Sequence, residues 1–434
     1  MKYKALLFLL FVLLVKTASA QNIPLNPLTT GIWRGVLKTS SGHNIPFNFE
    51  VSDTTKHQQV ITIFNGSERF KVTDIVYEGD SVFVHMPLYD SEFRLKFSHN
   101  RLTGRWKKHL GGQDAYMDFI ASPGVLWRFF RATQDPIFDV TGRWTAIFGD
   151  GTSKDTTVGV FNQTDVKLTG TFLTTTGDYR YLEGIVKDDS LYFSCFDGGH
   201  AYLFTAKLKD NHTLTGGKFY SGYSGVSDWT AFKNDSAKLP DAYSLTYLKP
   251  DSTKLNFSFP DINGIKVSLS DKRFKNKVVI VQLLGSWCPN CMDETNYFAS
   301  RYYNKYHSKG VEVIGLAYER SRDFTEAQRT LTQLKKHFNI PYPLLITGFT
   351  PAKGDPQKSL PMLADFMGFP TTIIIDRKGE VRKIHTGFSG PGTGSYYTDF
   401  IDEFERMTDA LVAEKPPKKS KKPVEDKEKK DSGN

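Results

Sequence analysis

Along the first half of the chain, apolar and polar residues alternate with a period of two. Segments such as Asp80–Met86 and Phe93–Phe97 place every second side chain on the same face, which is typical of half-buried antiparallel strands. Asp-Gly and Asn-Gly pairs between such segments favour tight turns. The pattern therefore predicts antiparallel β structure from about residue 21 to residue 235.

This strand-rich half contains an internal repeat. The sequence GIWRGVLKTS at 31–40 is echoed by GRWTAIFGDG at 142–151, EGDSVFVHMP at 78–87 by KDDSLYFSCF at 187–196, and NRLTGRWKKH at 100–109 by HTLTGGKFYS at 212–221. The matches keep their order and share nearly the same offset, which indicates a duplication. We expect two β units, residues 21–130 and 131–235, each an antiparallel sandwich or small barrel. Trp33 and Trp144 lie at equivalent positions and are expected in the two cores.

A different pattern begins near residue 251, where buried strands alternate with amphipathic helices. This alternation predicts an α/β domain with a central mixed sheet at residues 251–413, after a linker at 236–250. The expected elements are strands at 278–284 and 311–318, two strands joined by an Asp-Arg-Lys-Gly turn within 368–387, and helices at 325–338 and 396–414.

The first 20 residues have the pattern of a secretory signal peptide. A lysine-bearing start precedes an apolar run from Ala5 to Val15 and the small residues Ala18-Ser19-Ala20, so cleavage is expected before Gln21. The apolar run is shorter than the roughly 20 residues that span a bilayer. We therefore predict a periplasmic or secreted protein with no transmembrane segment after signal cleavage.

The formal net charge of +9 at pH 7 is concentrated at the two ends of the chain. Three lysines lie in the predicted signal peptide, and residues 414–434 hold eight lysines and five acidic residues. The part that is expected to fold is close to electrical balance, so the charge does not indicate a nucleic-acid partner. Residues 414–434 contain almost no apolar residues and are expected to be disordered.

The chain has three cysteines, and their positions predict different roles. Cys195 matches Met86 of the first repeat, which favours a buried, apolar role. Cys288 and Cys291 follow a predicted buried strand and open the next helix. Cys288 then lies at the helix N-terminus, where unpaired N–H groups and the helix dipole stabilise a thiolate, and Cys291 lies one turn further on.

Three kinds of chemistry could use this cysteine pair: redox exchange, metal binding or a structural disulfide. A zinc site needs four ligands, and neither a second Cys pair nor a His-x₃₋₅-His motif follows. A structural disulfide would need neither the helix N-terminus nor the adjacent Trp287. The pattern favours redox chemistry, with no metal and no cofactor other than a redox-active Cys288–Cys291 disulfide.

Several motifs resemble the thioredoxin superfamily. They are GSWCPNC at 285–291, GFPTT at 368–372 and DRKGEV at 376–381. The approach to the cysteines, FSFPDINGIKVSLSDKRFKNKVVIV at 257–281, and the acid in CPNCMDE more narrowly resemble the TlpA/ResA-type extracytoplasmic thiol-disulfide oxidoreductases of bacteria. The resemblance covers residues 255–413 and implies a thioredoxin-like fold there.

The resemblance also implies a substrate-binding loop. It implies that Pro370 has a cis peptide bond and faces the cysteines, and that Phe369 and Thr371 present their backbone to an extended substrate. Trp287 and Pro289, which flank the first cysteine, complete the expected substrate-contacting residues.

Glu294 is implied to be the acid that tunes the cysteine pair. Thioredoxin itself has a buried acid six residues before its first cysteine, whereas this chain has Gln282 there, so Glu294 is the sole proton-handling candidate. The dipeptide between the cysteines, Pro289-Asn290, differs from that of thioredoxin. Because this dipeptide influences the redox potential, the direction of electron flow stays open.

Together these patterns predict an extracytoplasmic enzyme that exchanges disulfides with protein thiols. Cys288 would attack and Cys291 would release the product, with a membrane or periplasmic partner supplying or removing electrons. The β units would position the enzyme or recruit its substrates. The alternative is a ligand-binding or adaptor protein in which the β units carry the main role and the redox domain is secondary.

Overall fold

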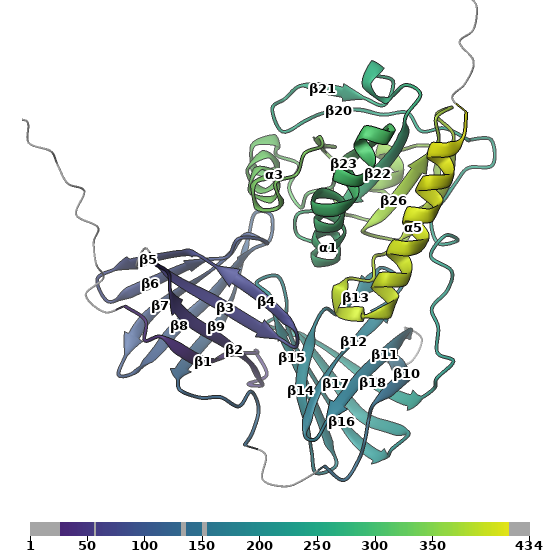
Figure 1. Cartoon of the computed structure of the whole chain (residues 1–434). Helices are drawn as coiled ribbons and strands as arrows, with labels where there is room; N and C mark the ends of the chain where they lie inside the picture. The colour runs from purple at the N-terminus through teal and green to yellow at the C-terminus, as the bar shows by residue number, and fades with distance from the viewer. Residues whose placement is uncertain (1–26, 56–57, 132–135, 150–153, 416–434) are drawn as a thin grey trace, which may run out of the picture.

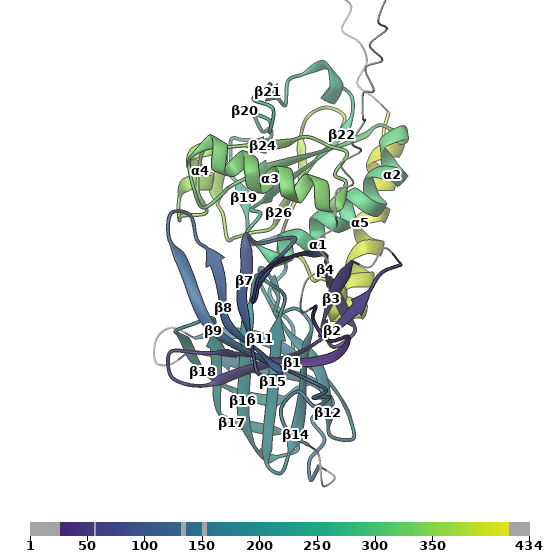
Figure 2. The same cartoon turned by 90° about the vertical axis from the view of Figure 1, so that its left-hand side faces the viewer.

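The computed structural model describes residues 27–55, 58–131, 136–149 and 154–415. Two β units lie side by side, and an α/β domain rests across them (Figures 1 and 2). The predicted signal peptide and nearly all of the lysine-rich tail lie outside the described residues. Within the described ranges, no helix has the length and apolar character needed to cross a membrane.

The first β unit is one curled antiparallel sheet of nine strands. The sheet order is β4-β3-β2-β1-β9-β8-β7-β6-β5, so the last strand pairs with the first and the two edge strands are neighbours in sequence. Alternate side chains of these strands form a single apolar core, as their period-two pattern predicts. The strands are β1 (Gly31–Lys38), β2 (Asn44–Asp53), β3 (Gln59–Asn65), β4 (Glu68–Val72), β5 (Asp74–Glu78), β6 (Ser81–His85), β7 (Ser91–Ser98), β8 (Arg101–His109) and β9 (Asp114–Pro123).

The second β unit repeats this topology and closes the ring. Its last strand again pairs with its first, and an additional pairing of β11 with β12 joins the two ends of the sheet, which makes a closed barrel. The strands are β10 (Gly142–Phe148), β11 (Asp155–Thr164), β12 (Lys167–Thr174), β13 (Gly177–Asp178), β14 (Leu182–Lys187), β15 (Ser190–Phe196), β16 (Ala201–Asp210), β17 (Thr213–Ser221) and β18 (Gly225–Lys233).

The two tryptophans confirm that the β units are copies of one fold. Trp33 and Trp144 are both buried, and each indole N–H donates to the carbonyl four residues earlier. The acceptors are Thr29 at 2.8 Å and Val140 at 2.9 Å. The predicted duplicated antiparallel units are confirmed. Both are barrel-like sheets that curl around an apolar core, open between β4 and β5 in the first unit and closed in the second (Figure 1).

The barrels share an apolar contact that is centred on Phe196. This residue ends β15 of the second barrel, but its ring packs on Phe47, Phe93 and Trp106 of the first barrel at centroid distances of 4.5, 5.4 and 5.3 Å. The backbone of Phe196 is held by Asn65, which donates to its carbonyl at 2.8 Å and accepts its N–H at 3.2 Å. The two repeats therefore form one continuous body.

The α/β domain has a five-stranded mixed sheet in the order β24-β23-β22-β26-β27. The three strands β22, β23 and β24 run parallel, and β26 and β27 are antiparallel to their neighbours. The domain comprises β19 (Tyr247–Leu248), β20 (Ser258–Pro260), β21 (Lys266–Ser268), β22 (Val278–Leu284), α1 (Pro289–Tyr297), α2 (Tyr303–Tyr306), β23 (Val311–Ala317), α3 (Phe324–Phe338), β24 (Leu344–Ile346), α4 (Asp355–Ser359), β25 (Leu363–Asp365), β26 (Thr371–Ile375), β27 (Val381–Thr386) and α5 (Ser395–Ala413).

The strands and helices that the sequence predicts in this domain are present. β22 is buried along its whole length, as its apolar run predicts. The sequence did not predict the short elements β24, α4 and β25. Residues 236–250, expected as a linker, contain β19, which pairs with β25 of the α/β domain.

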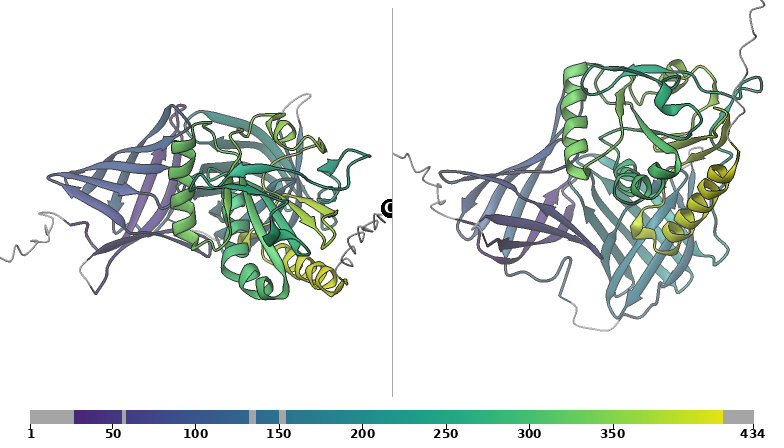
Figure 3. Two further views of the ribbon diagram at one scale, coloured as in Figure 1. Left: turned by 90° about the horizontal axis from the view of Figure 1, so that it is seen from above. Right: turned by 45° about the horizontal axis from the view of Figure 1, so that its top comes forward.

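Polar contacts fix the α/β domain on the first barrel. Arg329 of α3 pairs with Asp90 at 2.6 Å, and Glu326 of the same helix contacts the His109 ring at 3.0 Å. Gln333 donates to the backbone carbonyls of Met86 and Pro87 at 3.2 and 3.0 Å. Seen from above, α3 lies beside the first barrel while the rest of the domain covers the second (Figure 3).

Candidate active site

Cys288 caps the N-terminus of helix α1. The buried strand β22 ends at Leu284, a three-residue turn follows, and Pro289 occupies the first helical position, where its missing N–H costs nothing. The Cys288 sulfur accepts the backbone N–H of Cys291 at 3.2 Å. Unpaired helical N–H groups and the helix dipole therefore favour negative charge on this sulfur.

The two cysteines differ in access. They are joined by a disulfide with a Cα–Cα distance of 5.2 Å. Cys288 retains 6% of its surface and lines an open cleft, whereas Cys291 is fully buried. An incoming thiol or disulfide can therefore reach only the Cys288 sulfur. The third cysteine, Cys195, is buried in the second barrel core, and burial raises the pKa of its thiol well above the usual value.

Glu294 is a fully buried carboxyl group one turn after Cys291. Its two oxygens accept hydrogen bonds from Gln282 at 2.8 Å and from the Thr372 hydroxyl at 2.7 Å. Burial raises the pKa of Glu294 to about 7, and these two hydrogen bonds oppose part of that rise. A carboxyl group with this pKa can accept or donate a proton near neutral pH.

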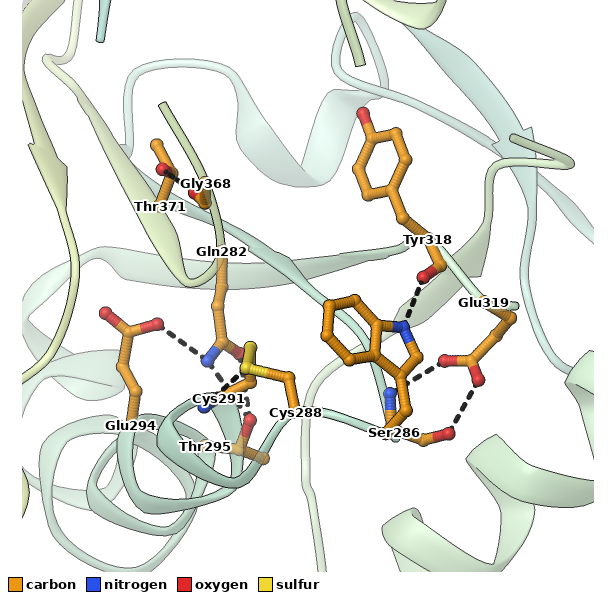
Figure 4. The surroundings of a disulfide bond; sticks show 11 residues. Gln282, Ser286, Cys288, Cys291, Glu294, Thr295, Tyr318, Glu319, Gly368 and Thr371 are labelled. Carbon is orange, nitrogen blue, oxygen red and sulfur yellow. Dashed lines mark hydrogen bonds between the residues drawn. A yellow bond between two sulfur atoms is a disulfide. The ribbon is translucent and has the colours of Figure 1, made fainter. Parts of the chain in front are cut away.

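Gln282 and Thr372 hold Glu294 because they are cross-strand partners. Gln282 on β22 lies directly opposite Thr372 on β26, and both side chains face helix α1. Gln282 also exchanges hydrogen bonds with the Thr295 hydroxyl at 3.1 and 3.2 Å. Gln282 lies at the sequence position where thioredoxin has its buried acid. In this protein its side chain instead positions Glu294 of helix α1 (Figure 4).

The turn before the cysteines is anchored on its other side by Glu319. This carboxylate accepts the N–H of Ser286 at 2.8 Å and its hydroxyl at 2.6 Å, as Figure 4 shows on the side of the disulfide away from Glu294. The Trp287 indole donates to the Tyr318 carbonyl at 2.8 Å. These bonds set the position of Cys288 relative to the sheet.

The loop before β26 packs against the same turn. The Phe369–Pro370 peptide bond is cis, as the resemblance implies. The Phe369 ring contacts Trp287 edge-on at 5.7 Å, and the Thr371 hydroxyl donates to the Gly368 carbonyl at 2.6 Å. Because the side chains of Phe369 and Thr371 are buried, their contact with a substrate would be through the backbone.

Arg180, from the loop after β13, joins all three domains beside α1. Its guanidinium pairs with Asp293, which lies between Cys291 and Glu294 in sequence, and with Glu68 of the first barrel at 2.7 Å. It also lies 3.5 Å from Asp197 of its own barrel. Burial raises the pKa of Asp293 to about 7, although Arg180 acts in the opposite direction. The active-site helix is thus tied to both barrels by one buried cation.

The structure brings the predicted residues together in two groups. Glu294 is buried one turn after Cys291 and is bound by Gln282 and Thr372, while Trp287, Cys288 and Pro289 line the cleft. The sequence did not point to Arg180, because its partner Asp293 is 113 positions away. The sequence did contain a signal for the role of Gln282, because it is the only polar residue in the apolar strand β22.

Among the described residues, no cluster of three or more His, Cys, Asp or Glu side chains could hold a metal ion.

Sequence comparison matches residues 249–399 to the Redoxin family. The thiol-disulfide oxidoreductase ResA of Bacillus subtilis (strain 168) is 28% identical over 132 residues, which are 30% of this chain and 64% of ResA. ResA of Bacillus thuringiensis subsp. konkukian is 30% identical over 126 residues, 29% of this chain and 63% of that protein. The C-terminal domain is a thioredoxin-superfamily domain of the TlpA/ResA type.

The matched region spans less than two thirds of the length of these two relatives. Among solved structures, a thiol:disulfide interchange protein of the thioredoxin family from Chlorobium tepidum TLS is 20% identical, with a TM-score of 0.29. It aligns over 37% of this chain and 96% of its own. The residues that match the Redoxin family, 249–399, include no strand of either barrel.

Proposed function

We propose that this chain is an extracytoplasmic thiol-disulfide oxidoreductase that acts on cysteine-bearing protein segments through Cys288 and Cys291. The observation that carries the proposal is the asymmetry of the pair. Cys288 lines a cleft at the N-terminus of a helix, whereas Cys291 is buried one helical turn before Glu294, a carboxyl group whose pKa is about 7.

The first step begins from the reduced pair. The Cys288 thiolate attacks one sulfur of a substrate disulfide, the substrate S–S bond breaks, and the other substrate sulfur leaves as a thiolate. A mixed disulfide now joins Cys288 to the substrate. The helix N-terminus favours this step because it keeps Cys288 deprotonated.

The second step releases the substrate. Cys291 loses its proton to Glu294 and attacks the Cys288 sulfur, and the second substrate sulfur leaves as a thiolate and takes up a proton. The substrate has gained two electrons, and Cys288 and Cys291 form the disulfide. A dithiol protein, in the membrane or in the same compartment, must then reduce this disulfide. With an oxidising partner, the same steps run in reverse.

The extracytoplasmic location rests on the N-terminal pattern of the sequence. A lysine-bearing start, a short apolar run and Ala18-Ser19-Ala20 are typical of a secretory signal. Cleavage before Gln21 would be detected by N-terminal sequencing of the mature protein from the producing cell.

The test of the activity uses the full-length protein, a synthetic disulfide-linked peptide and a dithiol reductant. Wild type should speed peptide reduction, and Cys288→Ser should abolish the acceleration. Cys195→Ala is the matched control, because it also removes one thiol but lies in a barrel core, and it should retain the wild-type rate. If Cys288→Ser retains that rate, the proposed function is wrong.

A ligand-binding role for the barrels has less support. The interior of the first barrel holds a void of only about 20 Å³ lined by apolar side chains, too small for an organic ligand. The second barrel core is filled by stacked rings, among them Phe204 and Phe219 at 4.3 Å. The larger space in contact with the barrels is the cleft at Cys288.

A further inference from the structure

The cleft at Cys288 has walls from all three domains. It has a volume of about 620 Å³, within the range of roughly 300–1,000 Å³ that is typical of ligand sites. The thioredoxin-like domain contributes Trp287 to Asn290, the first barrel contributes the ends of β8 and β9, and the second barrel contributes the β12–β13 hairpin. A substrate that reacts at Cys288 must therefore contact residues of the barrels.

The β12–β13 hairpin makes one wall of the cleft and packs tightly on the thioredoxin-like domain. A Cβ on Gly368, two residues before Pro370, would lie 2.7 Å from Cγ2 of Thr176 in the hairpin turn. Gly177 lies against the Asn290 side chain, which a Cβ would overlap. The hairpin therefore packs closely on the thioredoxin-like domain at both glycines. At about 620 Å³, the cleft beside this hairpin has room for a short extended segment.

The other two domains that line the cleft each contribute a cation. Lys108 projects from the end of β8, and Arg320 follows β23. The Arg320 guanidinium lies 5.4 Å from the ring of Trp287, the residue next to Cys288. A Cβ on Gly111, in the β8–β9 turn, would lie only 2.9 Å from Cβ of Arg320. The barrel thus brings Lys108 towards Arg320 and the reacting cysteine.

Neither cation forms an ion pair with a carboxylate within the described parts of the chain. The Lys108 ammonium donates to the Gly199 carbonyl. The charge of Asp197 acts on Lys108 without a hydrogen bond, and the charge of Glu319 acts on Arg320 in the same way. Burial, with a smaller effect from Arg320, lowers the pKa of Lys108 to about 8. The neighbouring Lys107, by contrast, pairs with Asp114 at 3.0 Å.

The acidic groups of the cleft belong to the wall formed by the second barrel. Asp178 is already bound, because it accepts the N–H of Gly390 at 2.7 Å and of Arg180 at 2.6 Å. Asp155 begins β11 on that barrel. The two cations without an ion pair therefore come from the first barrel and the thioredoxin-like domain, whereas the acids that line the cleft come from the second barrel.

We propose that this cleft binds a short, extended cysteine-bearing segment and that Lys108 and Arg320 hold a carboxylate next to its reacting sulfur. The inference rests on the proposed function and adds the class of substrate: acidic, flexible segments. Carboxylate binding would give both half-buried cations an ion-pair partner, which neither has among the described residues.

The experiment compares two synthetic peptide disulfides that differ only in having Glu or Lys beside the cysteine. Each rate with the full-length enzyme is divided by the rate of the same peptide with dithiothreitol, which removes the effect of the neighbouring charge on the disulfide itself. Wild type should favour the Glu peptide by roughly tenfold or more, as expected for a charge-assisted hydrogen bond.

Three variants assign this preference to its cause. Lys108→Gln should remove most of the preference, and Lys108→Arg should restore it. Lys107→Gln is the matched control, because it removes the same charge from the adjacent residue of β8, and it should keep the preference.

Each outcome bears on one proposal. Equal normalised rates for the two peptides with wild type, or an unchanged preference in Lys108→Gln, would overturn the acidic-substrate inference while the proposed function stands. If wild type reduces neither peptide, the proposed function itself fails.

Discussion

Replacing Glu294 by Gln should stabilise the protein at alkaline pH while slowing its chemistry. The pKa of this buried carboxyl rises from 4.5 to about 7 on folding, so the folded chain holds the proton more tightly than the unfolded chain. The stability from this difference is fully present below about pH 4.5 and is lost as the pH rises to about 7. At 1.36 kcal/mol for each pKa unit, the loss is about 3 kcal/mol.

Gln occupies nearly the same volume and stays neutral at every pH. Its carbonyl can accept from Gln282, as a Glu294 oxygen does at 2.8 Å, and its amide can donate to the Thr372 hydroxyl. We therefore expect similar free energies of unfolding for Glu294→Gln and wild type near pH 5, and a variant more stable by about 3 kcal/mol near pH 8.

Urea denaturation of the oxidised full-length proteins at both pH values measures this difference. Oxidation keeps Cys288 and Cys291 from titrating, and Asp293, whose pKa is also about 7, is common to both proteins and cancels. If the free energies of unfolding of Glu294→Gln and wild type differ by the same amount at both pH values, the assignment of a raised pKa to Glu294 is refuted.

The same substitution removes the proposed proton acceptor for Cys291. Release of the mixed disulfide should slow by roughly 100-fold or more, the usual contribution of a positioned base. The rise of the wild-type rate with an apparent pKa near 7 should disappear from the pH–rate profile of Glu294→Gln. A profile that matches wild type would exclude Glu294 from proton transfer.

Further predictions concern trapping, anchoring and the isolated domain. Cys291→Ser should accumulate mixed disulfides with substrates on non-reducing gels, and Cys288→Ser should not; trapping by Cys288→Ser instead would reverse the two roles. Arg180→Met should lower the free energy of unfolding by roughly 3–5 kcal/mol, because it leaves buried carboxylates without their partner, and an unchanged urea midpoint would contradict this. Residues 236–415 alone, which keep β19 and its pairing with β25, should fold and reduce insulin faster than the full chain, and should lose the natural substrate selectivity; identical sets of trapped proteins would contradict recruitment by the barrels.

The sequence predicted features that depend on short-range patterns. The position of Cys288 at a helix start follows from an apolar strand, a turn and a proline within 12 residues, and the strands of both barrels follow from period-two alternation. The duplicate tryptophans at positions 33 and 144 were visible because the repeats share local motifs. These features need no knowledge of how distant segments pack.

Features that depend on packing between domains could not be predicted in this way. The role of Gln282 requires knowing that Thr372 lies opposite it on the neighbouring strand. Lys107 and Lys108 are the same residue type at adjacent positions, yet only one lines the cleft at Cys288. Because side chains alternate along a strand, the two lysines point to opposite faces of the sheet. The sequence does not show which domain covers each of these faces.

The contact made by Phe196 imposes an order on the assembly of the chain. Synthesis proceeds from the N-terminus, so all strands of the first barrel exist before Phe196 is made. During that interval Phe47, Phe93 and Trp106 lack the ring that packs on them in the finished protein. Exposed apolar surface of this kind makes a partly made chain prone to aggregation and dependent on chaperones. The first repeat is the earliest part to be synthesised, but it reaches its final packing only after β15 of the second repeat has been made.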